Sequence, residues 1–209
     1  MNAEYAEFGF VSEKASHMHV HFMPQVLAFA GELVPGTRVL DVGCGNGFAC
    51  GEFLKRGCKV VGIDLSVEGI DLARRAYPEA RFELLGADSD ILERLGEQPF
   101  DIVISTEVVE HLYAPREWAA GCYGTLKGGG VFICTTPYHG YFKNLVISLL
   151  GKWDSHANPL WDGGHIKLWS RRTLSALLTE AGFRNLEFRG VGRLPGMRMT
   201  IVARGEKPL

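Results

Sequence analysis

The sequence predicts an α/β protein whose mostly parallel, doubly wound sheet of seven strands ends in an antiparallel hairpin. Apolar segments of strand length alternate with helical patterns over most of the chain, which is typical of a parallel sheet covered on both faces. The first strand runs directly into a loop with glycine at alternate positions from 43 to 47, and a helical pattern follows. Two further strand-like segments with a short link come after the last helical pattern and predict the hairpin.

The bulk composition fits a single domain covering residues 1–209, because domains commonly contain ~100–200 residues. The formal net charge is -2 and no long run of one sign occurs, so nothing favours nucleic acid as a partner. Five cysteines without a C-x-x-C spacing indicate reduced thiols, and the N-terminus shows no secretory pattern. No apolar stretch reaches the ~18 residues of a membrane span, and we expect a cytoplasmic protein.

Residues 1–36 are predicted to form an N-terminal helical cap, with a helix from Ser16 to Leu33 that lies over the ligand pocket. Pro24 falls inside this helix and predicts a kink or two separate pieces. His17 and His21 would share one helix face, so a metal-binding pair is the alternative to a plain covering helix.

Seven segments are predicted as strands because short apolar runs stand between turn residues. They are Thr37–Val42, Cys58–Ile63, Arg81–Leu85, Phe100–Ile104, Val131–Thr135, Leu186–Val191 and Met199–Ala203. The predicted helices between them are Phe48–Arg56, Val67–Ala76, a short one containing Ile91 and Leu92, Pro115–Leu126 and Arg171–Ala181. Lys127–Gly130 is predicted to stop a helix and form a turn, and residues 194–196 to link the hairpin strands.

The stretch Val39–Gly47 reads V-L-D-V-G-C-G-N-G and is the most informative part of the chain. Because glycine lacks Cβ, Gly43 and Gly45 can take positive φ and let a ligand touch the main chain. The dinucleotide fingerprint G-x-G-x-x-G is not matched, since Phe48 stands at its third glycine. Asp64 ends the second predicted strand, where a carboxylate can accept hydrogen bonds from ribose hydroxyls.

The pattern D-x-G-x-G-x-G after a strand, with an acid at the end of the next strand, resembles motif I of the class I methyltransferases, which bind S-adenosylmethionine (SAM). The segment Phe100–Leu112, F-D-I-V-I-S-T-E-V-V-E-H-L, resembles motif IV of the same family. The resemblance covers nearly the whole chain and implies a Rossmann-like fold with SAM as cofactor. It implies that the cofactor is bound by Asp41, Gly43, Cys44, Gly45, Asp64, Leu65, Asp88, Ser89 and Thr106. Asp88 would take the adenine amino group, and the alternative is that Asp88 caps the helix containing Ile91.

Glu107, Glu110 and His111 are spaced so that a helix would place them on one face. Two carboxylates and an imidazole can bind a divalent cation such as Mg²⁺, and His165 is a candidate fourth ligand. The pattern E-x-x-E-H with a later histidine resembles two branches of the family, the ubiquinone-biosynthesis O-methyltransferases and the small-RNA 2′-O-methyltransferases. In both, the resemblance implies a metal that clamps vicinal oxygens. The lack of a basic surface pattern and the T-P-Y-H-G layout favour the first branch, which acts on catechol-like rings.

A metal-free arrangement is the alternative, in which Glu107 touches SAM through its backbone while Glu110 and His111 form local hydrogen bonds. The catalytic candidates are His165, His139 and His111, because an imidazole titrates near neutral pH and can act as a general base. The sequence leaves both arrangements open.

Residues 138–169 are predicted to be a substrate lid insertion, because this stretch is the one that the fold explains least. Tyr141–Leu150 is apolar almost all round, so it is either a lid helix over a hydrophobic pocket or a helix in contact with a membrane surface. Trp153, Trp161 and Trp169 would line an aromatic pocket or serve as ordinary packing residues.

The sequence therefore predicts a methyltransferase that moves a methyl group from SAM to a hydroxyl oxygen of a small, aromatic or lipid-like molecule, with or without a metal. One alternative is metal-independent N- or C-methylation in natural-product biosynthesis, and another is a non-catalytic SAM-binding module. The expected partner is a small-molecule substrate rather than nucleic acid, and the oligomeric state is not specified.

Overall fold

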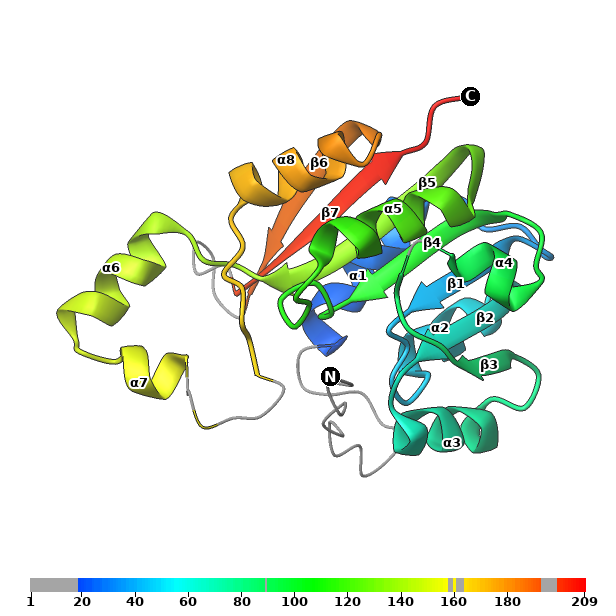
Figure 1. Cartoon of the computed structure of the whole chain (residues 1–209), viewed down its shortest axis with the longest axis horizontal. Helices are drawn as coiled ribbons and strands as arrows, with labels where there is room; N and C mark the ends of the chain where they lie inside the picture. Colours follow the sequence, from blue (N-terminus) through cyan, green and yellow to red (C-terminus); the bar gives the residue numbers. More distant parts are fainter. Residues whose placement is uncertain (1–18, 89, 158–159, 161–163, 193–198) are drawn as a thin grey trace.

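The computed structural model describes residues 19–88, 90–157, 160, 164–192 and 199–209. Its strands are β1 (Arg38–Val42), β2 (Lys59–Asp64), β3 (Arg81–Leu84), β4 (Phe100–Thr106), β5 (Leu126–Pro137), β6 (Arg184–Val191) and β7 (Thr200–Glu206). They form one seven-stranded sheet in the order β3-β2-β1-β4-β5-β7-β6 (Figure 1). Strands β1 to β5 pair in parallel, whereas β7 runs antiparallel to both β5 and β6. The predicted fold with its C-terminal hairpin is therefore confirmed.

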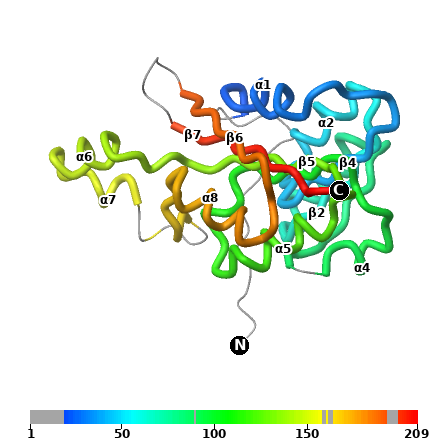
Figure 2. The backbone as a smooth tube through the Cα atoms, turned by 90° about the horizontal axis from the view of Figure 1, so that it is seen from above, coloured from blue at the N-terminus to red at the C-terminus, as the bar shows by residue number. Residues whose placement is uncertain are grey.

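Helices cover both faces of the sheet (Figure 2). They are α1 (His19–Ala30), α2 (Phe48–Leu54), α3 (Val67–Ala76), α4 (Ile91–Leu95), α5 (Pro115–Thr125), α6 (Tyr141–Leu149), α7 (Trp153–His156) and α8 (Arg171–Glu180). One buried apolar cluster joins the sheet to α1, α2 and α3 and includes Phe22, Phe53 and Ile70. A second cluster joins it to α4, α5 and α8 and includes Trp118 and Leu178. The continuous apolar strands of the sequence are explained by burial on both faces.

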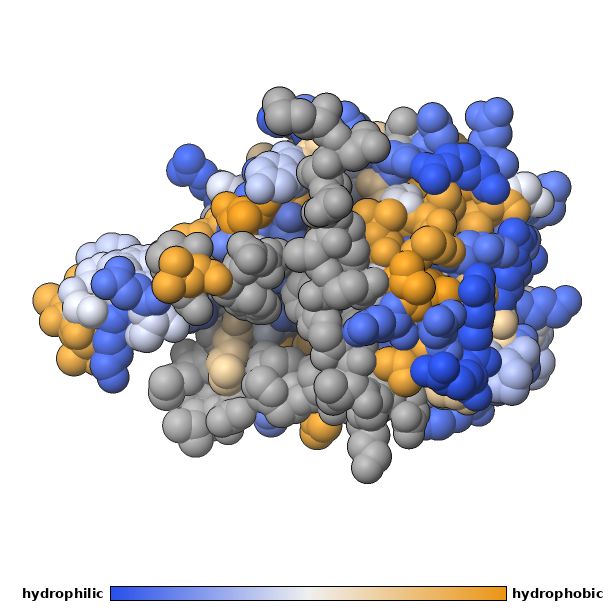
Figure 3. Space-filling model, turned by 60° about the horizontal axis from the view of Figure 1, so that its bottom comes forward, coloured by the Kyte–Doolittle hydropathy of each residue, from blue (hydrophilic) through white to orange (hydrophobic). Residues whose placement is uncertain are grey.

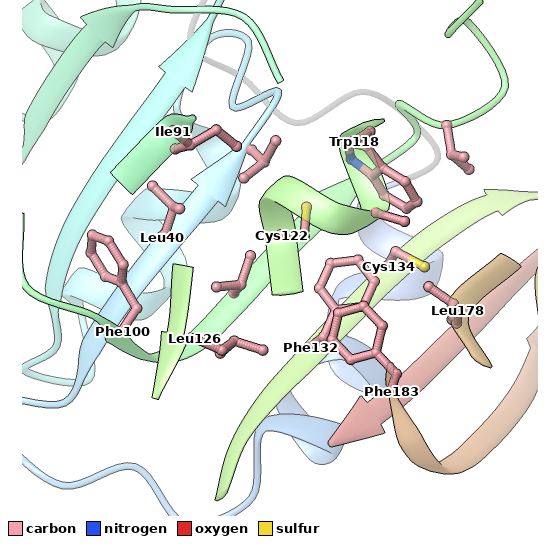
Figure 4. Packing of buried hydrophobic residues seen from close by; sticks show 14 of the residues in the cluster. Leu40, Ile91, Phe100, Trp118, Cys122, Leu126, Phe132, Cys134, Leu178 and Phe183 are labelled. Atoms are coloured by element: carbon pink, nitrogen blue, oxygen red, sulfur yellow. The ribbon is translucent and has the colours of Figure 1, made fainter. Parts of the chain in front are cut away.

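Aromatic rings fix α5 and the C-terminal segment against the sheet (Figure 4). The ring of Phe132 lies 5.5 Å from that of Trp118 and 4.8 Å from that of Phe183, measured between centroids. Trp118 Nε1 donates a hydrogen bond of 3.1 Å to Ser105 Oγ, which in turn donates one of 2.7 Å to the carbonyl oxygen of Val42. Helix α5 is thereby held at the ends of β1 and β4.

The register of the parallel strands brings several loops to one edge of the sheet. Val42 at the end of β1 pairs with Ile63 of β2, and Thr106 at the end of β4 pairs with Thr135 of β5. Because ligands of such sheets bind outside the carboxyl ends of the strands, this edge is where a site is expected. It carries the glycine loop after β1 and the acidic segment after β4.

The largest difference from the predicted elements is at the start of β5. Strand β5 begins at Leu126, so Lys127–Gly130 continues the strand instead of forming the predicted turn, and the pairing with β4 shifts register between Phe100 and Ile102. Helix α1 contains Pro24 as predicted. The predicted start of this helix, with His17, and the hairpin link at 194–196 lie outside the described residues.

Helices α6 and α7 project from one end of the sheet and contain no buried residue (Figure 1). The large apolar side chains that α6 and the residue after it expose are Tyr141, Phe142, Leu145, Val146, Leu149 and Leu150. Among the described residues, no helix has both the length and the apolar character needed to cross a membrane.

Candidate cofactor and metal site

The glycine loop after β1 has the backbone that the sequence predicts. Gly43, Gly45 and Gly47 all have positive φ, at 80°, 50° and 78°. A Cβ atom on Gly43 would stand 2.4 Å from Cγ2 of Val108, so any side chain there would collide with the segment after β4. The N–H groups of Gly43 and Cys44 donate to the carbonyl oxygen of Ile63 at 2.8 and 2.9 Å, which fastens the loop to β2.

Asp64 points at the glycine loop. Its Oδ2 accepts a hydrogen bond of 2.8 Å from the N–H of Gly45, and its Oδ1 accepts one of 2.8 Å from the N–H of Ser66. Helix α3 is capped by Ser66, whose hydroxyl accepts from the N–H of Gly69 at 2.9 Å. The carboxylate therefore lies at the mouth of the loop, next to the half-exposed Leu65, and does not serve as the side-chain cap of α3.

Asp41 and two cysteines form a buried group beneath the loop. Asp41 Oδ2 accepts a hydrogen bond of 3.3 Å from Cys50 Sγ, while Oδ1 is buried without a hydrogen-bond partner among the described residues. Burial raises the pKa of Asp41 to about 7 and that of the Cys44 thiol to about 11. The Cys44 side chain is thus an inert thiol that packs under the loop.

Asp88 does not cap the following helix. Helix α4 begins at Ile91 with Asp90 in the cap position, whereas Asp88 forms an ion pair with Arg94 and accepts a 3.2 Å hydrogen bond from the N–H of Asp90. The capping alternative is therefore wrong, and the adenine role stays a prediction. Ser89 lies outside the described residues. Thr106 is the half-buried last residue of β4.

The segment after β4 is a turn and not the helix assumed from the spacing. Glu107 has a φ of 55°, and its N–H donates to Oγ1 and to the carbonyl oxygen of Thr135 at 3.0 and 3.1 Å. Oγ1 of Thr135 donates to Glu107 Oε1 at 2.7 Å, so the side chain folds back on β5. The chain then turns at Val108, whose carbonyl oxygen accepts from the N–H of His111 at 2.9 Å. Glu107 is therefore set apart from the other predicted ligands.

Glu110, His111 and His165 are nevertheless brought together, with one ligand atom from each within 4.8 Å of the others. Oε1 of Glu110 lies 3.9 Å from Nε2 of His111 and 3.9 Å from Nε2 of His165. The carbonyl oxygen of Glu110 accepts the N–H groups of Ile166 and Lys167 at 3.0 Å each, which holds the later histidine beside the turn. Three of the four predicted ligands thus converge although they come from segments far apart in the chain.

Neighbouring residues hydrogen-bond to Glu110 and His111 and thereby orient their side chains. Glu110 is almost completely buried, with 1% of its surface exposed, and its Oε2 accepts a hydrogen bond of 2.9 Å from Thr136 Oγ1. Oε1 has no hydrogen-bond partner among the described residues. His111 Nδ1 lies 3.1 Å from the carbonyl oxygen of Gly164, a contact in which only a protonated Nδ1 can donate. In the neutral imidazole this leaves Nε2 as the acceptor facing Glu110.

Burial dominates the protonation of the cluster. It raises the pKa of Glu110 well above its usual range, and the charge of Glu107 adds to the effect. Burial, together with the neighbouring His111, lowers the pKa of His165 to about 4. A buried carboxyl group beside two imidazoles is a donor set that either a proton or a cation can stabilise.

His139 does not join this cluster. It is buried, and its ring faces that of His156 at 5.3 Å between centroids. Lys143 in the first turn of α6 completes this second group, which sequence reasoning missed apart from His139. The one charged residue of α6, Lys143, is the sequence signal that could have drawn attention to this group. Trp169 is buried and donates from Nε1 to the carbonyl oxygen of Val109 at 3.2 Å, so it packs as a core residue, and Trp161 lies outside the described residues.

Helix α1 reaches the start of α2. The His19 ring lies 5.0 Å from that of Phe48, the first residue after the glycine loop, and burial lowers the pKa of His19 to about 4. A hollow of about 480 Å³ lies between the two helices, lined by His19, Met23, Leu27, Phe48 and Glu52 among others. This hollow holds none of the predicted site residues.

A family model described as a methyltransferase domain matches residues 15–187 of the chain. The ubiquinone biosynthesis O-methyltransferase of Dinoroseobacter shibae is 29% identical over 163 residues, which cover 75% of this chain and 63% of that protein. The protein of the same name from Maricaulis maris is 35% identical over 104 residues, which cover 48% and 41%. The chain thus spans less than two thirds of the length of these curated relatives.

Solved structures show the same fold. The Burkholderia thailandensis 1,6-didemethyltoxoflavin-N1-methyltransferase, solved with S-adenosylhomocysteine, superposes with a TM-score of 0.66 at 21% identity and covers 89% of this chain and 77% of its own. A SAM-dependent methyltransferase from Archaeoglobus fulgidus gives a TM-score of 0.66 at 18% identity and covers 89% and 91%. The fold of these structures and the match to the family model are in line with the interpretation of the glycine loop and of Asp64 as a methyltransferase motif. The chain belongs to the methyltransferase-domain family, as its motifs predict.

Proposed function

We propose that the protein transfers a methyl group from SAM to a hydroxyl oxygen of a small, catechol-like molecule, assisted by a divalent cation at Glu110, His111 and His165. The observation that carries the proposal is the buried Oε1 of Glu110, which faces an imidazole nitrogen of each histidine at 3.9 Å. The relatives named as ubiquinone biosynthesis O-methyltransferases support the choice of oxygen and of a catechol-like ring.

The cofactor would lie over the glycine loop. The lack of Cβ at Gly43 and Gly45 lets an adenosyl group approach the main chain, and the carboxylate of Asp64, which contacts the loop at Gly45, would accept ribose hydroxyls. SAM supplies a methyl group on a positive sulfur, and its transfer is an in-line displacement. The chain contributes orientation, which can account for ~7–11 kcal/mol of the barrier.

The kinds of ligand atom in the cluster indicate which cation would fit it. Two imidazole nitrogens and one carboxylate oxygen lie together, whereas Glu107 lies outside the group. Mg²⁺ prefers oxygen ligands, so this set is better suited to Mn²⁺ or Zn²⁺ than to the Mg²⁺ expected from two carboxylates. A divalent ion held there would supply Lewis acidity that favours the ionised form of a nearby hydroxyl.

The remaining residues orient these donors. Thr136 fixes the carboxylate of Glu110, and the carbonyl oxygen of Gly164 sets the tautomer of His111. If no cation is bound, His165 is placed to accept the proton of the hydroxyl instead, because burial keeps its imidazole neutral at pH 7.

Residues 138–169 would be the substrate lid, and α6 would meet a lipid-like tail or a membrane surface. Figure 3 shows apolar side chains on the projecting lobe that contains α6. Phe142 and Leu149 are exposed by 79% and 76%, which is unusual for apolar side chains unless a partner or ligand covers them.

Methyl transfer to catechol and to phenol, measured with and without EDTA and added Mn²⁺ or Mg²⁺, tests the proposal. We expect catechol to be methylated on oxygen, EDTA to abolish the reaction, and Mn²⁺ to restore it. Methylation that is unaffected by EDTA would contradict the metal. Binding of SAM without turnover of any hydroxyl, amine or carbon acceptor would identify a binding module instead.

A further inference from the structure

A second group of basic side chains lies beside the Glu110 cluster. His139 follows the end of β5, Lys143 stands in the first turn of α6, and His156 is the last residue of α7. The rings of His139 and His156 meet at 5.3 Å, and the N–H of His139 donates to the carbonyl oxygen of Trp169 at 3.0 Å. Three separate elements therefore place two imidazoles and an ammonium together.

Two side chains of this group, His139 and Lys143, have polar atoms that could still bind a ligand. His139 has only 7% of its surface exposed, and its Nδ1 makes no hydrogen bond of normal geometry among the described residues, although the Asn144 side chain lies close to this ring. Nζ of Lys143 donates to the carbonyl oxygen of Tyr138 at 3.1 Å, and no described carboxylate lies within ion-pair distance. Because an ammonium carries three donors, Lys143 keeps donors for a further acceptor.

The group is close enough to the Glu110 cluster to influence it. The charges of Lys143 and His156 both act on His165, and Lys143 interacts with Glu107 across the same space. Lys143 also acts on His139 and His156. A ligand bound to this group would therefore lie near the Glu110 cluster.

The positive charge of Lys143 indicates whether such a ligand is a cation or an anion. A cation would be repelled by Lys143, which makes a second metal site unfavourable. An oxyanion would accept from Lys143 and from the imidazole N–H groups, and hydrogen bonds to ionised groups are the strong ones.

We propose that His139, Lys143 and His156 form an oxyanion-binding subsite, so that the molecule methylated beside Glu110 carries a carboxylate or a phosphate. This inference rests on the proposed O-methyl transfer for its placement, but the subsite itself is defined by binding alone.

Calorimetry on the full chain with S-adenosylhomocysteine tests the subsite. The probes are 3,4-dihydroxybenzoate and its neutral amide, with inorganic phosphate as competitor. We expect the acid to bind roughly 10- to 100-fold more tightly than the amide, the factor expected for a hydrogen bond to a charged group. Displacement of the acid by millimolar phosphate would favour a phosphate ligand, and resistance to it a carboxylate. Equal affinity for acid and amide, or no binding of either, would overturn the subsite.

Variants locate the effect. Lys143→Gln should remove the preference for the acid and leave affinity for the amide within about twofold, while Lys143→Arg should retain the preference. Lys152→Gln, an exposed lysine beside α7, is the matched control and should behave as the parent protein. If Lys143→Gln lowers affinity for acid and amide equally, Lys143 is structural and the proposal is wrong. Zn²⁺ binding offers a second check. If the Glu110→Gln variant binds Zn²⁺ and the added substitution His139→Gln abolishes that binding, the group binds a cation and the proposal is wrong.

The two proposals fail separately. If neither probe is methylated but the acid still binds more tightly than the amide, the subsite stands and the proposed function is wrong. If both are methylated at equal rates with equal affinities, methyl transfer stands and the subsite is overturned.

Discussion

Asp64, the last residue of β2, and Glu110, which follows β4, have different surroundings, although both lie at the same edge of the sheet. Both oxygens of Asp64 accept backbone N–H groups at 2.8 Å, so its position is fixed by the loop that it contacts. Glu110 has one oxygen held by Thr136 and the other buried without a described partner. The carboxylate of Asp64 is thus held in place by the backbone of the loop, whereas that of Glu110 keeps one buried oxygen that a ligand could contact.

The comparison indicates a division of tasks. A preformed loop costs little rearrangement when a cofactor binds, which favours affinity. A buried carboxylate with an unmet interaction is costly to the fold and is retained where a cation, proton or substrate completes it.

The largest loss of methyl transfer should come from Glu110→Gln, because this substitution removes the buried carboxylate that distinguishes Glu110 from Asp64. The amide keeps the size of the side chain but loses the charge that faces both histidines. We expect methyl transfer to fall by more than the roughly 10- to 100-fold typical of losing an outer support of a metal site, with affinity for SAM unchanged. Initial rates with saturating Mn²⁺ provide the measurement, and the exposed Glu93→Gln is the control. A rate near that of the parent protein would remove Glu110 from the mechanism.

Gly43→Ala should have the second largest effect, a loss of affinity for SAM. Its Cβ would stand 2.4 Å from Val108, in addition to the strain of a φ of 80°. Gly36→Ala is the matched control, because it has a similar φ of 89° and no atom within 4 Å of the added Cβ. Both variants should lose about 1 kcal/mol of unfolding free energy in urea from backbone strain. Only Gly43→Ala should also lose affinity for SAM in calorimetry, and equal affinities would contradict the clash.

Asp64→Asn should weaken SAM binding by roughly 10-fold, because the acceptor loses its charge while one amide oxygen remains for the loop. Methyl transfer at saturating SAM should change little, since Asp64 is far in sequence and role from the reactive cluster. Asp71→Asn on the exposed side of α3 serves as control. Tritium transfer at several SAM concentrations separates the two parameters. A fall in turnover with unchanged KM for SAM would place Asp64 in catalysis instead.

Asp41→Asn should act on stability rather than on turnover, and its effect should be seen in the pH dependence of unfolding. Burial raises the pKa of Asp41 to about 7, so between its unfolded pKa near 4 and this value the folded protein holds a proton that the unfolded chain releases. Unfolding free energy therefore declines as pH rises through this window, by up to about 1.4 kcal/mol per pH unit from this group. Urea titrations from pH 5 to 7 should show a shallower decline for Asp41→Asn. Parallel declines would mean that Asp41 is ionised throughout.

Sequence reasoning succeeded where local chemistry decides the structure. The glycine loop, the acid at the end of β2 and the mostly parallel sheet follow from residue type and alternation, because positive φ and burial on both faces restrict the choice of residues. The turn after β4 could not be predicted, since Glu107 takes a left-handed backbone conformation that is stabilised by its contacts with Thr135 in β5, a residue far away in the sequence. The group of His139, Lys143 and His156 depends on how α6 and α7 return toward β5, and spacing carries no information about that.

The proposed O-methyl transfer depends most on a cation being bound where Glu110, His111 and His165 converge. Titration of Mn²⁺ into the protein, followed by electron paramagnetic resonance, measures this directly. The account predicts one bound ion per chain in the parent protein, with binding lost in Glu110→Gln and kept in Glu93→Gln. Mn²⁺ that remains entirely unbound in the parent protein, or that binds equally to Glu110→Gln, would contradict it.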